Sequence, residues 1–464
     1  MVKLLFFADL IDTVTERGRR LLALERGNWT VASSTPGQLL ELSQRLLSIR
    51  GEASGVALAR SILDGYFGLS REGRLAFLGA LNDEFGPDTQ SLDHALRRYQ
   101  EDPGPESVRG IHDAAEPRRQ ELIRRLNMAV RGTRDLVRMR ADVLDGIRSG
   151  GPLAQLDADF LHLFSSWFNR GFLVLQPVDW TTPANILEKV IRYEAVHEIQ
   201  DWQDLRRRLE PDDRRCFAFF HPQLADEPLI FVEVALTQSM PDAIAPLLTP
   251  ERAPIAAREA THAVFYSISN CQPGLAGVSF GNFLIKQVVE ELKRQFSNLK
   301  TFVTLSPVPG FSNWLRRELH AANSAFMSES LKAQVAGLIA SGNEKDADRG
   351  RSARDLLMPL AAAYLLKARL PNGKPVDPVA RFHLGNGARL ECLHWMGDTS
   401  PKGIAQAEGL MVNYLYDLDS IVENHESFAN SGTIHASATV RKLLRPDRTP
   451  PGNVATPSNS RVHR

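Results

Sequence analysis

Residues 262–311, "HAVFYSISNCQPGLAGVSFGNFLIKQVVEELKRQFSNLKTFVTLSPVPGF", decide the predicted fold. The first eight residues are rich in β-branched and aromatic types, which favours a strand. Residues 282–296 carry apolar side chains at three- and four-residue intervals, which is typical of an amphipathic helix. A second β-type run begins at Thr301. The stretch therefore predicts a strand, a loop, a helix and a further strand.

The flanking sequence extends this pattern in both directions. Upstream, "RCFAFFHP" (215–222) and "PLIFVEVALT" (228–237) predict two strands joined by a hairpin-sized loop. Before residue 170 the apolar pattern is helical, and Thr35-Pro36 is a cap and first-turn pair. We therefore predict an α+β protein, with an N-terminal all-α helical bundle followed by a mixed α/β domain.

The predicted domains are residues 1–170 for the helical bundle, 171–445 for the mixed domain and 446–464 for a disordered tail. Within the mixed domain, residues 387–396 predict a strand, and residues 401–428 predict mostly helix. The polar segment at residues 340–350, "ASGNEKDADRG", is typical of a mobile loop.

Charge and cysteine content exclude some classes of protein. Lys+Arg and Asp+Glu each total 55 and the pI is about 7.2, which argues against a nucleic-acid or membrane-surface binder. The sequence has no run of eighteen consecutive apolar residues. Cys216, Cys271 and Cys392 are an odd number of widely spaced cysteines, which favours reduced thiols in a cytoplasmic protein.

The loop "CQPGLAGVSFGNF" (271–283) lies between a predicted strand and a predicted helix. Its glycines let the backbone approach a ligand closely, and the N–H groups that open the helix suit a pyrophosphate. The loop lacks the Gly-Lys-Ser/Thr of a phosphate-binding Walker loop. Residues 277–281 also match G-x-S-x-G, the nucleophile elbow of α/β-hydrolases. Residues 272–276 intervene between the strand and this motif, and the parallel βαβ series of a hydrolase is missing, so the hydrolase interpretation is disfavoured.

Two further segments contain candidates for acid–base or polar chemistry. In "TFVTLSPVPGF" (301–311), Pro307 and Pro309 are expected to end the sheet, so that Ser306 projects instead of pairing. His383 lies in "FHLGNGA", at an expected helix end before a Gly-Asn-Gly turn, and histidine is the usual acid or base near neutral pH. His394 is expected on a sheet face. The segment "HEIQD" (197–201) fails the HExxH zinc pattern, and we predict no metal site.

Four blocks together, "LAGVSFGNFLIKQVVEELKRQF", "TFVTLSPVPGFSNWL", "PVARFHLGNGARL" and "GLMVNYLYDL", resemble malonyl-CoA decarboxylases in their order and separation. The resemblance implies a helical N-terminal domain and a CoA-binding catalytic domain related to the GNAT acetyltransferase fold. It further implies that malonyl-CoA is converted to acetyl-CoA and CO2 without metal or organic cofactor. Members of the family assemble, commonly as tetramers, so a homo-oligomer is expected.

The resemblance also implies the residues that form the site. Ser306, His383 and Tyr416 take the catalytic positions. From the chemistry of the reaction we expect Tyr416 and Asn386 to be secondary polar contacts. Animal members carry a glutamate where this chain has Ser279, so no catalytic acid is assigned there. The CoA loop comprises Ala276, Gly277, Val278, Ser279, Phe280, Gly281 and Asn282.

Loss of CO2 from a malonyl thioester leaves an enolate, which requires hydrogen-bond donors and then a proton. We expect Ser306 to orient the acyl group and His383 to protonate the enolate carbon. Two other functions stay open from sequence alone. One is an acyltransferase that passes acetyl from acetyl-CoA to an amine, and the other is a non-catalytic protein that binds CoA esters.

Overall fold

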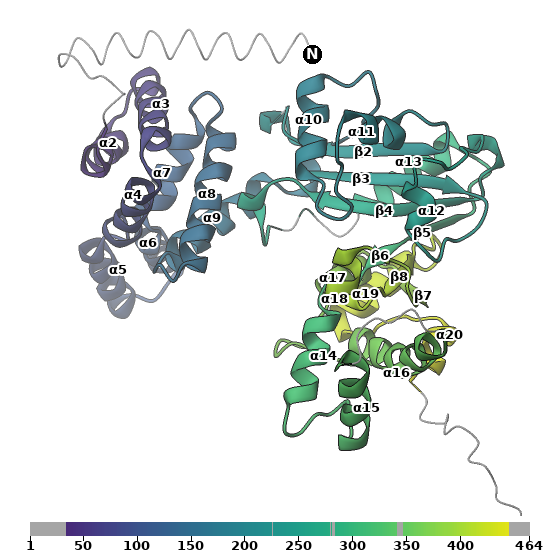
Figure 1. The fold of residues 1–464 in the computed structure, drawn as a ribbon. Coiled ribbons are helices and arrows are strands. Elements are labelled where there is room, and N and C mark those ends of the chain that lie inside the picture. Colours follow the sequence, from purple (N-terminus) through teal and green to yellow (C-terminus); the bar gives the residue numbers. More distant parts are fainter. Residues whose placement is uncertain (1–33, 225, 279, 281–283, 341–346, 445–464) are drawn as a thin grey trace, which may run out of the picture. The chain divides into compact units, whose positions relative to one another are not determined.

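The computed structural model describes residues 34–224, 226–278, 280, 284–340 and 347–444 (Figure 1). Its contacts divide the chain into two compact units. The first comprises Met1–Arg206, Cys216–Val232 and Ile268–Leu284, and the second comprises Arg207–Arg215, Glu233–Ser267 and Ile285–Arg464. The predicted disordered tail and residues 341–346 of the predicted mobile loop lie outside the described residues.

The first unit contains a bundle of helices, as the sequence predicts (Figure 1). The predicted cap is present, because the Thr35 hydroxyl accepts from the Gln38 N–H and the Gln38 side chain accepts from the Thr35 N–H. The bundle helices are α2 (Pro36–Ser48), α3 (Glu52–Gly68), α4 (Arg71–Glu84), α5 (Thr89–Glu101), α6 (Pro105–Ala115), α7 (Arg118–Asn127), α8 (Gly132–Arg148) and α9 (Ala154–Trp167).

The bundle core is apolar but contains a buried ion pair. Arg119 on α7 pairs with Asp159 on α9, and both side chains are more than 90% buried. Gln120 also donates to Asp159, at 2.6 Å, and Arg119 donates to the Asn82 carbonyl at 3.1 Å. These hydrogen bonds satisfy the buried charges and tie α7 to its neighbours.

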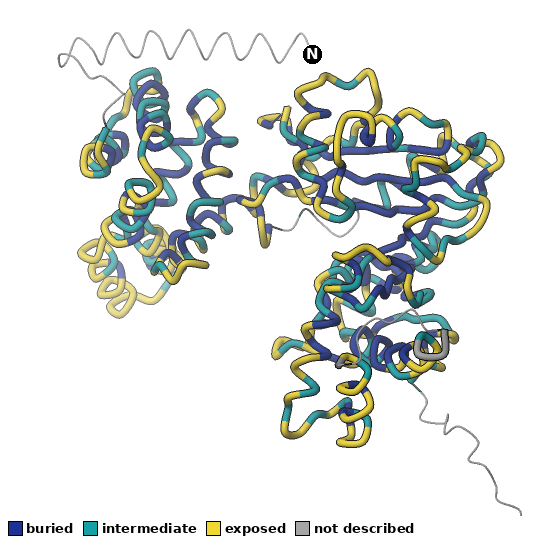
Figure 2. Tube along the Cα trace, viewed as in Figure 1, coloured by how far each residue is buried: buried dark blue, intermediate teal, exposed yellow. Residues whose placement is uncertain are grey.

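The strands form one mixed sheet in the order β1-β2-β3-β4-β5-β8-β6, and β7 also pairs with β8. Strands β4 and β5 are parallel, with Val264 opposite Val303, and β8 is antiparallel to β5, β6 and β7. Figure 2 shows that β2, β3 and β4 are buried along most of their length. The strands are β1 (Val174–Pro177), β2 (Arg214–Phe220), β3 (Ile230–Thr237), β4 (His262–Asn270), β5 (Thr301–Thr304), β6 (Ser306–Pro307), β7 (Arg389–His394) and β8 (Met411–Leu415).

The prediction that residues 401–428 are mostly helical is wrong, because this segment contains strand β8. These residues form α18 (Pro401–Ala407), then β8, then α19 (Ile421–Ser431), and not a mostly helical segment. Helix α18 ends because Glu408 and Gly409 both adopt positive φ values, of 52° and 77°. The following β-type residues are then free to enter the sheet beside β5.

The end of the sheet near Ser306 also differs from expectation. Ser306 and Pro307 do pair, opposite Val412 and Met411 of β8. Pro307 is tolerated because β6 is the last strand in the sheet order, where one side of the backbone needs no partner. The sheet therefore continues through Ser306 instead of ending before it.

The remaining helices connect and flank these strands, so the predicted α+β class with a helical N-terminal part is confirmed. Among the described residues, no helix combines the length and apolarity needed to cross a membrane. The helices are α10 (Ala184–Tyr193), α11 (Trp202–Leu209), α12 (Ala245–Leu248), α13 (Leu284–Gln295), α14 (Phe311–His320), α15 (Glu329–Ala340), α16 (Ala347–Leu366), α17 (Pro378–Gly385) and α20 (Ala438–Lys442).

Candidate active site

Two predicted site residues from distant parts of the chain meet in the second unit. Ser306 Oγ, at the start of β6, lies 3.2 Å from His383 Nε2, on α17. The two residues are 77 positions apart in sequence, and both are buried, at 6% and 3% exposure. The fold therefore places a hydroxyl and an imidazole within hydrogen-bond distance.

Tyr416, the third predicted catalytic residue, lies on the other side of the imidazole, with its hydroxyl 2.8 Å from His383 Nδ1. Ser306 Oγ donates its proton to Thr304 Oγ1 at 2.9 Å. Because a serine hydroxyl has one proton, His383 Nε2 must then donate to Ser306 Oγ. A neutral imidazole with its proton on Nε2 accepts at Nδ1, so Tyr416 donates there. Each residue therefore donates to the next: Tyr416 to His383, His383 to Ser306, and Ser306 to Thr304.

Burial keeps these groups neutral. The site has removed the His383 imidazole from water, which lowers its pKa to about 3. Burial also raises the pKa of the Tyr416 hydroxyl well above its usual value. At neutral pH the imidazole is therefore uncharged and the phenol is protonated, as the direction of the hydrogen bonds requires.

Aromatic rings fix the orientation of the His383 imidazole. The Tyr414 ring stacks on it, with centroids 4.6 Å apart and an interplanar angle of 24°. Tyr416 approaches it edge-on at 6.0 Å, and Phe265 packs against Tyr416 at 6.1 Å. The Tyr414 hydroxyl is buried without a hydrogen-bond partner among the described residues. Packing of this kind allows the ring little rotation.

Local signals define both ends of the helix that carries His383. Asp377 caps α17 by accepting from the Ala380 N–H at 2.8 Å, and Pro378 occupies the first turn. At the other end Asn386 donates to the Phe382 carbonyl at 2.7 Å. Gly387 has a φ of 81°, and an added Cβ there would lie 2.1 Å from the Ile421 carbonyl oxygen. His383 thus lies in the last turn of a helix before the Gly-Asn-Gly turn, as the sequence predicts.

The predicted CoA loop belongs to the first unit. Its described residues are Ala276, Gly277, Val278 and Phe280, whereas Ser279, Gly281 and Asn282 lie outside the described residues. Upstream, Gly274 has a different role from the one that the sequence suggests. A Cβ at Gly274 would lie 1.8 Å from the Val137 carbonyl oxygen on α8. The space beside this glycine is therefore occupied by the backbone of α8 and not by a ligand.

Two residues of the site were missed by the sequence analysis. Thr304 accepts from both Ser306 Oγ and the Tyr414 N–H, at 2.9 and 3.1 Å, and so fixes the serine hydroxyl. Tyr414 stacks on His383. Each lies two residues from a predicted site residue in or next to a strand, and period-two spacing places such pairs on one face.

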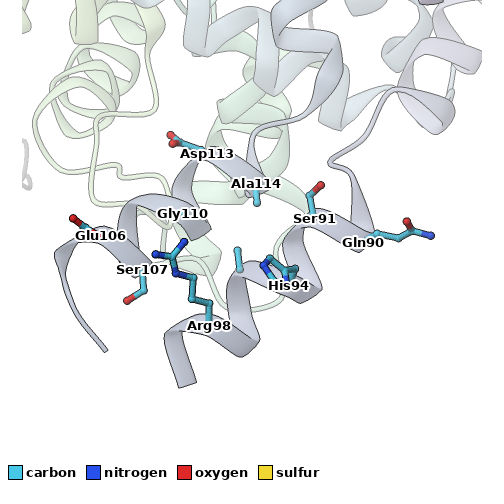
Figure 3. A pocket seen from close by; sticks show the side chains of 10 residues that line it. Gln90, Ser91, His94, Arg98, Glu106, Ser107, Gly110, Asp113 and Ala114 are labelled. Carbon is cyan, nitrogen blue, oxygen red and sulfur yellow. The ribbon is translucent and has the colours of Figure 1, made fainter. Parts of the chain in front are cut away.

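Other candidate residues and clefts are not part of this site. His394 lies on β7 and bonds to the Asn413 side chain. A cleft between α5 and α6 is lined by His94, Arg98, Glu106 and Asp113, and it contains no predicted site residue (Figure 3). The part of the chain that the structure describes has no cluster of three or more His, Cys, Asp or Glu side chains arranged to hold a metal ion.

Comparison with protein families agrees with the resemblance seen in the sequence. Residues 171–453 match the family model "Malonyl-CoA decarboxylase C-terminal domain", and residues 85–168 match "Malonyl-CoA decarboxylase N-terminal domain". A mitochondrial malonyl-CoA decarboxylase of Anser anser anser is 34% identical over 415 residues, which is 82% of this chain and 81% of the relative. That of Rattus norvegicus is 37% identical over 360 residues, or 71% and 72% of the two chains.

Solved structures give the same result. The crystal structure of malonyl-CoA decarboxylase from Rhodopseudomonas palustris is similar with a TM-score of 0.86 and 58% identity, over 88% of this chain and 100% of that one. The structure from Agrobacterium vitis has a TM-score of 0.83 and 54% identity, over 88% and 99% of the two chains.

The low pKa of His383 predicts a pH-dependent stability. Its value of about 3 in the folded state lies below the unfolded value of about 6.5, so the unfolded state binds the additional proton between these pH values. The free energy of unfolding therefore falls as pH falls through this range. Protonation of His383 alone should lower it by about 2 kcal/mol between pH 7 and pH 5.

Urea unfolding of the wild type and of His383→Asn at both pH values measures this contribution. The variant should lose about 2 kcal/mol less than the wild type on acidification. Equal losses in the two proteins would show that His383 is not held neutral by the fold.

Proposed function

Because the chain belongs to the malonyl-CoA decarboxylase family, we propose that its conversion of malonyl-CoA to acetyl-CoA and CO2 passes through an enolate that His383 protonates. The observation that carries this mechanism is the chain of hydrogen bonds through His383, which directs an Nε2 proton toward Ser306.

The reaction breaks the bond between the carboxylate carbon and the α-carbon. The electron pair of that bond passes to the α-carbon and the thioester oxygen, and CO2 leaves. His383 then transfers its Nε2 proton to the α-carbon and regains a proton from solvent before the next turnover. A thioester enolate is a strong base, so a neutral imidazole suffices as the acid. The transfer leaves an imidazolate, to which the Tyr416 hydroxyl donates at Nδ1.

Ser306 is proposed to hold the acyl group. Its single proton points to Thr304 in the structure, and rotation about the Cβ–Oγ bond would redirect it to a carboxylate or thioester oxygen. Hydrogen-bond donors that are already placed where negative charge develops lower the barrier without further reorganisation. Thr304 keeps the hydroxyl oriented until substrate arrives.

Tyr416 and Asn386 have supporting roles in this proposal. Tyr416 donates to His383 Nδ1, which keeps the proton of the imidazole on Nε2. Asn386 uses its amide N–H to end α17, and its buried Oδ1 has no hydrogen-bond partner among the described residues. That oxygen remains available as a secondary polar contact for substrate.

We assign binding of the CoA portion to the glycine loop. The support comes from the glycine content of the loop and from Gly277. Its φ of 80° is a backbone conformation that residues with a side chain rarely adopt. The proposed reaction uses no metal or organic cofactor, because the thioester itself delocalises the charge of the enolate.

A decarboxylation assay tests this function. Malonyl-CoA alone, with protein dialysed against a chelator and no acceptor present, should yield CO2 and acetyl-CoA.

His383→Asn should lower kcat by about 10²- to 10⁴-fold with little change in KM, because it removes the proton donor and not a binding group. Ser306→Ala should lower the rate by about 10²- to 10³-fold. His320→Asn, at an exposed histidine of α14, is the matched control and should keep the wild-type rate.

A wild-type rate in His383→Asn would remove this histidine from the mechanism. Transfer of acetyl from acetyl-CoA to an amine, without CO2 release from malonyl-CoA, would identify an acyltransferase instead. Binding of CoA esters with neither reaction would identify a non-catalytic protein.

We also propose that the chain forms a homo-oligomer through its helical bundle. The support is the α5–α6 hairpin, which exposes Leu96, Tyr99 and Val108 by 41%, 38% and 53%. Apolar side chains grouped on one hairpin favour burial against another copy. Light scattering of the purified protein should therefore give a mass above 51.6 kDa, and Leu96→Glu with Val108→Glu should lower it. A monomeric wild type would contradict this assembly.

A reducing compartment such as the cytoplasm is proposed for the active protein. The support is the odd number of widely spaced cysteines, of which Cys216 and Cys271 are buried and Cys392 is partly buried. Thiols of this kind persist where disulfides are reduced.

A further inference from the structure

The turn that precedes the proposed CoA loop is attached to the helical bundle. Residues 272–278 contain a short 3-10 helix, Pro273–Leu275, which packs on α8. Gly274 makes this contact possible, because any Cβ would collide with the Val137 carbonyl oxygen at 1.8 Å. The backbone of the turn therefore touches the backbone of α8 directly, without an intervening side chain.

Arg140, one turn of helix after Val137, holds the same residues from α8. Its side chain is 1% exposed, and its Nη1 donates to the carbonyl oxygens of Gly274 and Ala276, each at 2.9 Å. Its Nε donates to Asp157 Oδ1 at 2.8 Å, which balances the charge. A buried guanidinium with a carboxylate and two carbonyl acceptors makes strong, directional hydrogen bonds.

These bonds determine which way the peptide groups of the turn face. The carbonyls of Gly274 and Ala276 are directed to α8. The N–H groups of Leu275, Ala276 and Val278 are used inside the turn, at 2.9 to 3.1 Å. The Gly277 N–H has no hydrogen-bond partner within the described part of the chain, and the positive φ of Gly277 sets its direction. The arrangement leaves the Gly277 N–H available among the donors of the described turn.

We propose that Arg140 is a positioning residue for substrate binding: it fixes the turn 272–278 in the conformation that receives the CoA portion of the thioester. The helical bundle then contributes to substrate affinity without supplying a group that touches the reacting atoms. This inference rests on the proposed function, because it takes the glycine loop as the part that binds CoA.

Arginine suits this position better than lysine. Its planar fork reaches two carbonyls with one nitrogen and Asp157 with another, whereas a lysine ammonium is a point donor on a flexible stem. A lysine would keep the positive charge but lose part of the geometry. The two substitutions, Arg140→Met and Arg140→Lys, therefore separate loss of charge from loss of orientation.

Steady-state kinetics and binding of free coenzyme A test the proposal. Arg140→Met should raise KM for malonyl-CoA and Kd for coenzyme A by about tenfold or more, with kcat changed by less than about threefold. Arg140→Lys should give a smaller increase in both constants. Arg138→Met is the matched control: Arg138 is exposed two residues away on α8, lies over the Phe67 ring, and should leave KM and Kd unchanged.

A purely structural role for Arg140 would lower kcat through loss of active protein, with KM and Kd unchanged, and that result would overturn the proposal. Should Arg140→Met fail to fold, Asp157→Asn provides the second test. It keeps the arginine but removes its counter-charge, and it should also weaken coenzyme A binding; unchanged binding would contradict the proposal. Absence of CO2 release by the wild type would refute the decarboxylase function, whereas the coenzyme A measurement would still test Arg140.

Discussion

The hydrogen bond between Ser306 and His383 is the interaction on which the proposed chemistry depends. It joins the edge of the sheet to α17 across 77 residues of sequence, at 3.2 Å. Several local features position its two partners. The capped and glycine-terminated α17 presents His383, and pairing of β6 with β8 places Ser306. Tyr416 and Thr304 at the ends of the hydrogen-bond chain then determine where each proton lies.

Burial is what makes this histidine suitable as a proton donor of the proposed kind. An exposed imidazole would be partly protonated near neutral pH, and the location of its proton would fluctuate between the two nitrogens. Here the loss of hydration lowers the pKa of His383 to about 3, and the stacked Tyr414 ring prevents reorientation. The site therefore offers one neutral tautomer to the enolate, at the cost of stability in acid.

Sequence alone predicted the features that depend on neighbouring residues. The Thr35-Pro36 cap and the helix end at His383 were correct because capping and glycine turns are local signals. Strand β8 was missed because four of its five residues are buried, so the alternation that marks a half-exposed strand is absent. With β8 missing, Tyr414 could not be placed beside His383.

The contact of Gly274 with α8 joins segments 137 residues apart, counted from Val137 to Gly274, and no local pattern reveals it. The assignment of Ser306, His383 and Tyr416 to catalysis came from the family resemblance and remains a prediction.

The proposed chemistry requires that His383 is neutral and carries its proton on Nε2. Nitrogen NMR of ¹⁵N-histidine-labelled protein, with His383→Asn used to assign the signal, measures both properties directly. We expect one neutral tautomer protonated at Nε2 from about pH 5 to pH 8. A signal that titrates near pH 6.5, or a proton located on Nδ1, would contradict it.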